Sequence, residues 1–239
     1  MKNIALAFLL SFLCFSSAKA SDVNINPIRI DLSNTAKIAD FTIFNRGSEP
    51  VTFEAHALHW GQMEESRWYF SKTNDITVYP KIITIAPQEK GVIRVGFTGQ
   101  DAPSEKSYRL FVKELSDPRQ KENGVSFRTQ INLPIFYRGS GFVQKVYGKA
   151  TATWVRGGVL NFKLENEGNA HVKPQVVTYK FSKDGAPVHV AQGKMEAYAL
   201  PGRVALWSLV TGFDCTKVDR VDIEGEGDFK SAVALTCPQ

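Results

Sequence analysis

Residues 125–138 have the sequence VSFRTQINLPIFYR, and the alternation of their side chains is the strongest structural signal in the chain. Val125, Phe127, Thr129, Ile131 and every second residue after them are apolar or β-branched, whereas the residues between them are mostly polar. This period of two is typical of a β-strand with one buried face. At about 3.3 Å per residue the thirteen residues Val125–Tyr137 would extend about 43 Å, against about 17–20 Å for a usual strand. We therefore expect one core to cover only part of the row and to leave the rest exposed.

Pro134 interrupts this segment with a residue that has no backbone N–H. Proline in a sheet is confined to edge strands, strand starts and bulges, so it favours an edge position here. A long apolar edge strand is an aggregation hazard unless a partner covers it. The alternative is a central strand whose apolar row simply faces its own core, and periodicity alone leaves both interpretations open.

The same alternation continues from Val23 onward, with Gly, Pro, Asn or Asp every eight to twelve residues. Many short strands without helical patterns between them favour β-sandwiches over a parallel α/β sheet. We predict an all-β protein with two Ig-like β-sandwich domains, 21–139 and 140–239, joined at Gly139–Gly141. The apolar Phe142 directly after the join indicates two sandwiches held at a fixed angle.

The first twenty residues have the three regions of a secretory signal peptide. Lys2 precedes an apolar run, Ile4–Phe15, and the segment ends in Ala18-Lys19-Ala20. A membrane anchor is the alternative, although its apolar core would need about 20 residues and this run has about a dozen. No later segment is long and apolar enough to span a membrane. We predict that residues 1–20 are a secretory signal peptide that is cleaved on export.

The composition of the chain indicates a folded protein and gives no sign of nucleic-acid binding. The chain has 239 residues, 43% hydrophobic and 22% charged, as in ordinary globular proteins. Its formal charge of +5 falls by two when the signal and its two lysines are removed, and so mild an excess does not indicate nucleic acid. Cys14 leaves with the signal, and Cys215 and Cys237 remain. In an exported protein such a pair predicts a disulfide; two unpaired thiols are the alternative.

Signals for catalysis are missing from the sequence. It has no G-x-S-x-G, H-E-x-x-H, Walker or Rossmann motif, so we predict no enzyme activity and no cofactor. His56 and His59 lie three apart, which places them on opposite faces of a strand and argues against a shared metal site. His171 and His189 are interpreted as ordinary surface or turn residues. The four tryptophans are interpreted as core residues rather than as a sugar-stacking platform.

The order of several segments resembles one known family, the PapD-like periplasmic chaperones of chaperone–usher pilus assembly. The resemblance covers nearly the whole chain after residue 20. The matching segments are Pro27–Ile30, Phe44–Asn45, Val78–Pro87, Val92–Val95, Ser107–Leu110, Lys113–Leu115, Leu133–Arg138, Leu164–Asn169 and Tyr198–Gly202.

The resemblance implies two Ig-like domains in an L-shaped arrangement and a pilus subunit bound along the last strand of domain one. The mechanism would be donor-strand complementation, in which an extended strand completes the sheet of an incomplete partner. By position, Val125, Phe127, Thr129 and Ile131 would be the inserted side chains. The subunit would then pass to an outer-membrane usher. Whether the free chain caps itself as a dimer is left open.

The family also holds the subunit's C-terminal carboxylate with a pair of basic residues. Arg29 matches the arginine of that pair, and a planar guanidinium suits a carboxylate. Where the family has a lysine, this chain has Pro134, so Arg94 or Lys145 is a candidate replacement. The alternative for Arg29 is a surface arginine in a weak ion pair.

Glu105 and Arg138 match two members of an interdomain salt-bridge network in the family. The third member would be an acid near the C-terminus, for which we take Glu226 among Glu224, Glu226 and Asp228. Two other functions are weighed against the chaperone: a fibre subunit or adhesin, and an exported carbohydrate-binding or hydrolytic β-sandwich. Against the former, two complete strand sets are expected and the mature N-terminus is a poor donor segment.

Overall fold

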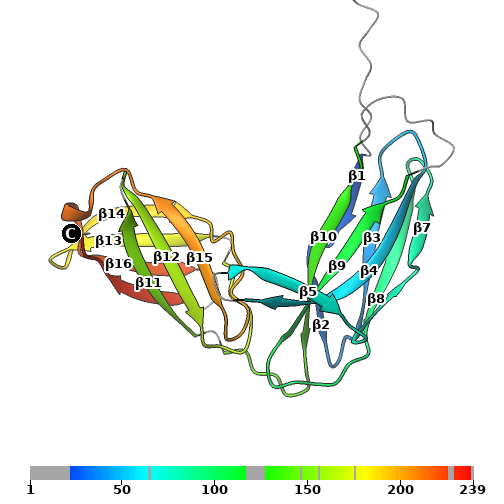
Figure 1. Ribbon diagram of the computed structural model, residues 1–239, viewed down its shortest axis with the longest axis horizontal. Helices are drawn as coiled ribbons and strands as arrows, with labels where there is room; N and C mark the ends of the chain where they lie inside the picture. The colour runs from blue at the N-terminus through cyan, green and yellow to red at the C-terminus, as the bar shows by residue number, and fades with distance from the viewer. Residues whose placement is uncertain are drawn as a thin grey trace, which may run out of the picture.

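The computed structural model describes residues 22–63, 66–116, 127–145, 147–155, 157–174, 176–225 and 229–237. Over these residues the chain forms two β-sandwiches at the two ends of a bent molecule (Figure 1). The prediction of an all-β protein with two sandwich domains is therefore confirmed. The predicted signal peptide lies outside the described residues. In the part of the chain that is described, no helix has the length and apolar character needed to cross a membrane.

Domain one packs two sheets, with strand orders β1-β3-β8-β6 and β2-β10-β9-β4-β5, and β7 pairs with β4. Inward residues such as Phe41, Ile93, Leu110 and Ile135 are fully buried between the sheets. The strands are β1 (Val23–Asn26), β2 (Ile30–Ser33), β3 (Ile38–Asn45), β4 (Val51–Gln62), β5 (Trp68–Lys72), β6 (Ile76–Tyr79), β7 (Ile82–Ile85), β8 (Lys90–Phe97), β9 (Lys106–Glu114) and β10 (Gln130–Arg138).

Domain two packs a sheet of order β11-β12-β15 on a sheet of order β14-β13-β16-β17. Its core includes Phe162, Phe181 and the Trp207 indole, which donates a hydrogen bond of 2.7 Å to the Tyr179 hydroxyl. Its elements are β11 (Gly148–Val155), β12 (Val159–Asn166), β13 (Val177–Lys183), β14 (Ala186–Gly193), β15 (Val204–Val210), the 3-10 turn η3 (Cys215–Lys217), β16 (Arg220–Gly225) and β17 (Lys230–Ala234).

The predicted disulfide is present in domain two. Cys215, at the start of η3, is bonded to Cys237, which follows β17. The bond closes a loop with a sequence separation of 22 residues, and the chain-entropy estimate for such a loop is about 3 kcal/mol of stabilisation. The cross-link ties the last described residues of the chain to the rest of the sandwich.

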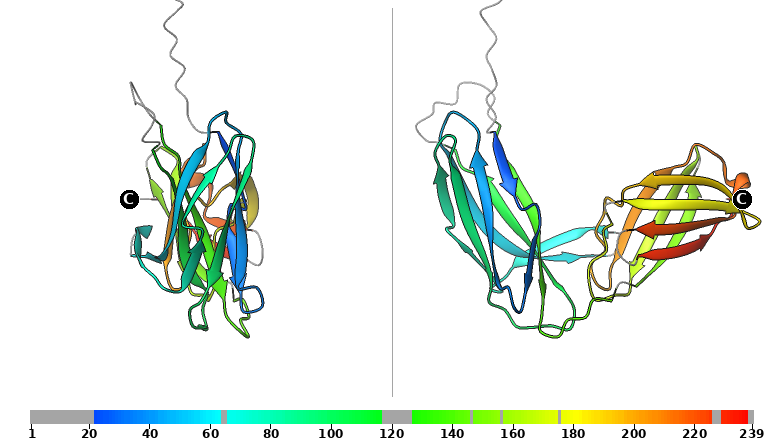
Figure 2. Two further views of the ribbon diagram at one scale, coloured as in Figure 1. Left: turned by 90° about the vertical axis from the view of Figure 1, so that its right-hand side faces the viewer. Right: turned by 180° about the vertical axis from the view of Figure 1, so that it is seen from behind.

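The β4–β5 hairpin of domain one extends past its own sandwich toward domain two, as the right-hand view of Figure 2 shows. Pairing of β4 with β9 ends at His59, whereas pairing with β5 runs on to Gln62 at the end of β4. Gly61 leaves room for the Tyr69 ring of β5 to lie over β4, because a Cβ there would lie 2.1 Å from that ring. The link between β10 and β11, within which the predicted boundary lies, joins the two domains along the chain.

Candidate functional site

The last strand of domain one has an incompletely paired margin. β9 pairs with β10 along Gln130–Tyr137, but β2 pairs with β10 only along Ile135–Arg138. In the described part of the chain, residues 130–134 therefore have a neighbouring strand on one side only. Such a margin presents backbone donors and acceptors that a further strand can pair with.

Side-chain burial changes along the same segment. Phe127 is 58% exposed, Thr129 and Ile131 are partly exposed, and Ile131 packs at the margin of the domain-one core. From Leu133 to Tyr137 every residue is buried. The expectation that one core covers only part of the alternating row is thus met for the described residues, and Val125 lies outside them.

Pro134 lies at the position where the pairing of β10 changes. β2 begins to pair one residue later, at Ile135, so no described strand on that side requires the N–H that proline lacks. On the other side Pro134 is the cross-strand neighbour of Arg109 in β9. Ile30 pairs with Ile135, which places Arg29 beside Pro134 on β2's side. Cross-strand neighbours share a face of the sheet, so Arg29 and Arg109 flank the proline on one face.

Arg109 is a buried cation without an anionic partner. The residue is 6% exposed, and its guanidinium carbon lies 3.9 Å from the ring centroid of Trp60 and 5.0 Å from that of Trp68. Within the described residues its Nε is buried without a hydrogen-bond partner, and no carboxylate forms a salt bridge with it. Burial lowers the pKa of Arg109, although a guanidinium stays protonated in proteins. A buried, incompletely paired guanidinium is suited to bind an anion.

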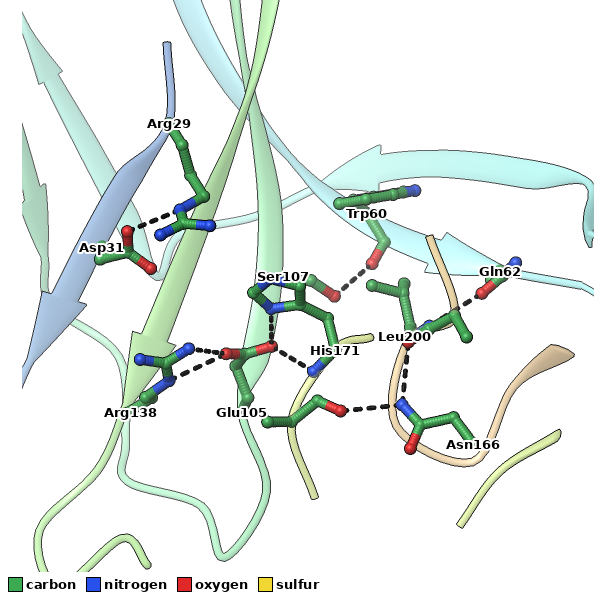
Figure 3. Close-up of polar contacts among 12 residues, drawn as sticks. Arg29, Asp31, Trp60, Gln62, Glu105, Ser107, Arg138, Asn166, His171 and Leu200 are labelled. Carbon is green, nitrogen blue, oxygen red and sulfur yellow. Dashed lines mark hydrogen bonds and ion pairs between the residues drawn. The ribbon is translucent and has the colours of Figure 1, made fainter. Parts of the chain in front are cut away.

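The three basic residues considered from the sequence occupy different places. Arg29 donates from Nε to Asp31 at 2.7 Å, and both side chains are exposed (Figure 3). Arg94 lies on β8, where it projects from the outer face of the other sheet and pairs with Asp40 at 2.9 Å. Because that face is on the opposite side of the sandwich, Arg94 is a wrong candidate for a site shared with Arg29. Lys145 lies in the link between the domains, where its backbone N–H donates to the Asn169 side chain.

Sequence reasoning missed Arg109, although it belongs to the quoted segment Ser107–Leu110. Its distance from Pro134 in the sequence hides that the two residues are neighbours. Only the register of β9 on β10 brings them together. A search for a basic residue on the strand that precedes the proline-containing strand would have found it.

A polar network joins the domains around Glu105, whose side chain is fully buried. One carboxylate oxygen accepts from Arg138 at 2.9 Å, and the other accepts from the His171 backbone N–H at 2.9 Å and contacts the His171 ring at 2.7 Å (Figure 3). The structure thus contains the expected ion pair of Glu105 with Arg138. Glu226, the expected third member, lies outside the described residues, and Glu224 pairs with Lys180 within domain two.

The sequence analysis interprets His171 as an ordinary surface or turn residue, but in the structure its side chain is part of the domain junction. Its ring stacks on Phe136 of β10 with centroids 3.7 Å apart, and its side chain is 9% exposed. The sequence could not show this, because the stacking partner belongs to the other domain. His171 is the domain-two member of the network.

An apolar cluster and one amide complete the domain junction. Trp60, Phe136 and Leu200 form a buried cluster with Tyr198 packed against it. The Gln62 side chain accepts a hydrogen bond from the Leu200 N–H at 3.0 Å (Figure 3). Its amide nitrogen donates to the carbonyls of Tyr198 and Val204 at 2.9 and 2.6 Å. The tip of the hairpin is thus hydrogen-bonded directly to the loop before β15. These contacts hold the two sandwiches in a defined orientation.

Residues 22–142 match a family model described as pili and flagellar-assembly chaperone, PapD N-terminal domain. The match covers about half of the 239 residues and includes all the described strands of domain one. No curated protein matches the chain significantly.

Solved structures resemble the chain over both domains. A chain of the CsuC–CsuE chaperone–tip subunit pre-assembly complex of Acinetobacter baumannii is 18% identical with a TM-score of 0.60, covering 91% of this chain and 100% of that one. The class 5 fimbriae chaperone CfaA is 14% identical with a TM-score of 0.59, covering 91% and 100%. The Escherichia coli chaperone DraB is 15% identical with a TM-score of 0.54, covering 93% and 99%. At these identities the likeness establishes the two-domain fold.

Proposed function

The chain belongs to the PapD-like family of pili and flagellar-assembly chaperones, and from this premise we propose that it caps fibre subunits in the periplasm by donor-strand complementation and delivers them to an outer-membrane usher. The observation that carries the proposal is the margin of β10, which combines an exposed Phe127 with residues that have a strand on one side only. CsuC, a structural relative, is described in complex with a subunit.

The strand mechanism follows from what this margin offers. A subunit that lacks its last strand has an open groove with unpaired backbone groups, and a strand from a partner supplies the missing hydrogen bonds. Phe127, Thr129 and Ile131, with Val125 before them, would insert into that groove because alternate side chains share a face. Each large apolar side chain that becomes buried contributes roughly 1.5–3 kcal/mol. We expect Phe127 to contribute most, since it is large and exposed in the free protein.

The basic residues beside Pro134 support the second half of the proposal, in which the subunit's C-terminal carboxylate is held at Arg29 and Arg109. β2 pairs with β10 in parallel and starts at Ile30. A subunit strand that pairs with residues 130–134 in the same parallel sense would therefore end against Arg29. Arg109 would gain there the anionic partner that it lacks, in a charge-assisted hydrogen bond. In this proposal the second basic residue of the anchor is Arg109, and neither of the candidates from the sequence, Arg94 and Lys145, has that role.

The experiment that tests the strand is co-expression in periplasm of the full chain, carrying a C-terminal tag, with candidate fibre subunits from the same genome. We expect a one-to-one complex that survives purification and is lost with Phe127→Asp. Val190→Asp is the matched control, because Val190 is 60% exposed on β14 of domain two. A complex that tolerates Phe127→Asp as well as it tolerates Val190→Asp would contradict the strand mechanism.

The same assay tests the anchor. Arg109→Met should weaken the complex at least tenfold, whereas Arg94→Met, which removes an arginine from the opposite face, should leave it unchanged. Circular dichroism of each purified variant checks that the fold is retained. Equal binding by the two variants would show that Arg109 does not hold the subunit.

A further inference from the structure

Tyr198 of domain two has a cation from each domain near its ring. The Arg109 guanidinium carbon lies 5.5 Å from the ring centroid, and the Lys173 ammonium lies 4.4 Å from it. Lys173 is held there by an isolated β-bridge, in which Val172 and Ala199 exchange two backbone hydrogen bonds of 2.9 Å. The bridge places Lys173 and Tyr198, the residues next to it, side by side.

The charges around this ring are unevenly compensated. Arg29 already has Asp31 as its ion-pair partner. Arg109 has no such partner among the described residues. The pKa of Lys173 is lowered, first by burial and then by the positive charge of Arg109, while the acid Glu196 acts in the opposite direction. Two like charges from different domains therefore repel each other at the junction, and an anion between them would relieve that repulsion.

We propose that Lys173 of domain two is a further cation of the carboxylate site. The C-terminal carboxylate of the bound subunit would then be held across the domain junction, by Arg109 on one side and Lys173 on the other. This inference rests on the proposed function and adds a residue to its anchor. Arginine offers a planar fork to the carboxylate, and lysine adds a point charge that can approach from another direction. Trp60 and Tyr198 supply an apolar wall that strengthens both interactions by excluding water.

The inference makes binding depend on the junction. Lys173 reaches the site only because the Gln62 amide and the Glu105–His171 contacts hold domain two against domain one. A chain end is the favoured anion because it would arrive along β10, in line with β2, at the position where Arg29 and Arg109 flank Pro134. A free anion such as phosphate offers the same charge without the strand.

The test measures binding of a synthetic peptide to the full chain by calorimetry at low ionic strength. The probe is an acetylated octapeptide of alternating valine and threonine that ends in tyrosine, made with a free carboxylate and with a C-terminal amide. We expect the natural protein to bind the acid at least tenfold tighter than the amide. Lys173→Met should weaken binding of the acid three- to tenfold and leave binding of the amide unchanged.

Lys149→Met is the matched control, since it removes an exposed lysine from β11 of the same domain, and it should behave like the natural protein. If Lys173→Met retains the full preference for the acid, the role of Lys173 is wrong while the proposed function stands. If the natural protein binds neither peptide or does not distinguish them, the proposed anchor itself fails. Displacement of the acid by inorganic phosphate at equal concentration would overturn the assignment to a chain end.

Discussion

The two halves of the segment 125–138 at the end of domain one lie in opposite environments where the structure describes them. Residues 133–137 are all buried, and from Ile135 to Tyr137 the strand lies between β2 and β9, whereas residues 130–134 are paired with β9 alone and Phe127, which precedes them, is exposed. Residue type accounts for part of the contrast, because Pro134 and Phe136 are apolar at the alternate positions that carry the polar Gln130 and Asn132 in the other half. The neighbours of the strand account for the rest, because β2 pairs with the second half alone, and the first half is the part that we propose pairs with a partner.

The largest expected effect lies in the buried half. Phe136→Ala should lower the free energy of unfolding by about 3–5 kcal/mol, because it opens a cavity where Phe136 stacks on His171 and contacts Trp60. Urea denaturation followed by circular dichroism measures this loss. If Phe127→Ala costs as much in the same experiment, the contrast between the two halves is false.

A smaller loss is expected from the ion pair at the end of the buried half. Glu105→Ala should cost about 2 kcal/mol, since charge-assisted hydrogen bonds contribute about 1.5–3 kcal/mol and the variant leaves Arg138 and His171 without their shared acceptor. Glu224→Ala, which removes an exposed partner of Lys180, serves as the control and should change stability little. Equal unfolding midpoints for the two variants would show that the junction network does not stabilise the protein.

The pH dependence of stability tests the buried half in another way, because its cross-strand neighbour Tyr108 is hydrogen-bonded to the carboxylate of Asp75. Tyr108, the cross-strand partner of Ile135, donates to Asp75 at 2.5 Å, and this bond lowers the pKa of Asp75, with Lys106 acting in the same direction. A carboxyl whose native pKa lies below its unfolded value stabilises the fold above the unfolded pKa, here 3.8, and loses that contribution as the pH falls through the native pKa.

Asp75→Asn should therefore be less stable than the natural protein at pH 7, and the gap between them should narrow on acidification to pH 3. Denaturation in urea at both pH values measures the gap. If the difference in the free energy of unfolding is the same at both pH values, the charge of Asp75 does not contribute to stability.

The smallest effect on stability is expected at the exposed side chain of Phe127. Phe127→Ala should change the free energy of unfolding by no more than about 0.5 kcal/mol, because substitutions of exposed side chains without packing partners usually fall in that range. Thermal unfolding of the free protein measures it. A loss above about 1 kcal/mol would show that Phe127 packs within its own domain, and Phe127 would then not be one of the side chains that we propose insert into the subunit.

Several features of the protein could be predicted from the order of its residues. The period of two in residues 125–138 predicts a strand that is only partly covered, and the paired Cys215 and Cys237 predict a disulfide, which the structure contains. These signals are local, or depend only on composition, so they require no knowledge of the partner strand. The site was harder to predict. Arg94 was considered and lies on the wrong sheet, and Arg109 was overlooked.

His171 shows the same limit at the domain junction. Nothing in its surroundings along the chain points to Glu105 or Phe136, which are 66 and 35 positions away and belong to the other domain. Stacking and hydrogen bonding across the junction arise from the docking of two finished sandwiches. Such contacts depend on distances that no short sequence window contains.

Alternation along the backbone sets which side chains share a face, because successive residues of an extended chain point in opposite directions; this much of the protein is written in its residue order. Strand register and domain docking are set by long-range packing: register brings Arg109 beside Pro134, and docking brings Arg109 to the Tyr198 ring that Lys173 also contacts. The all-β sandwich fold therefore follows from local geometry, whereas the basic site exists only once two strands and two domains have been brought together.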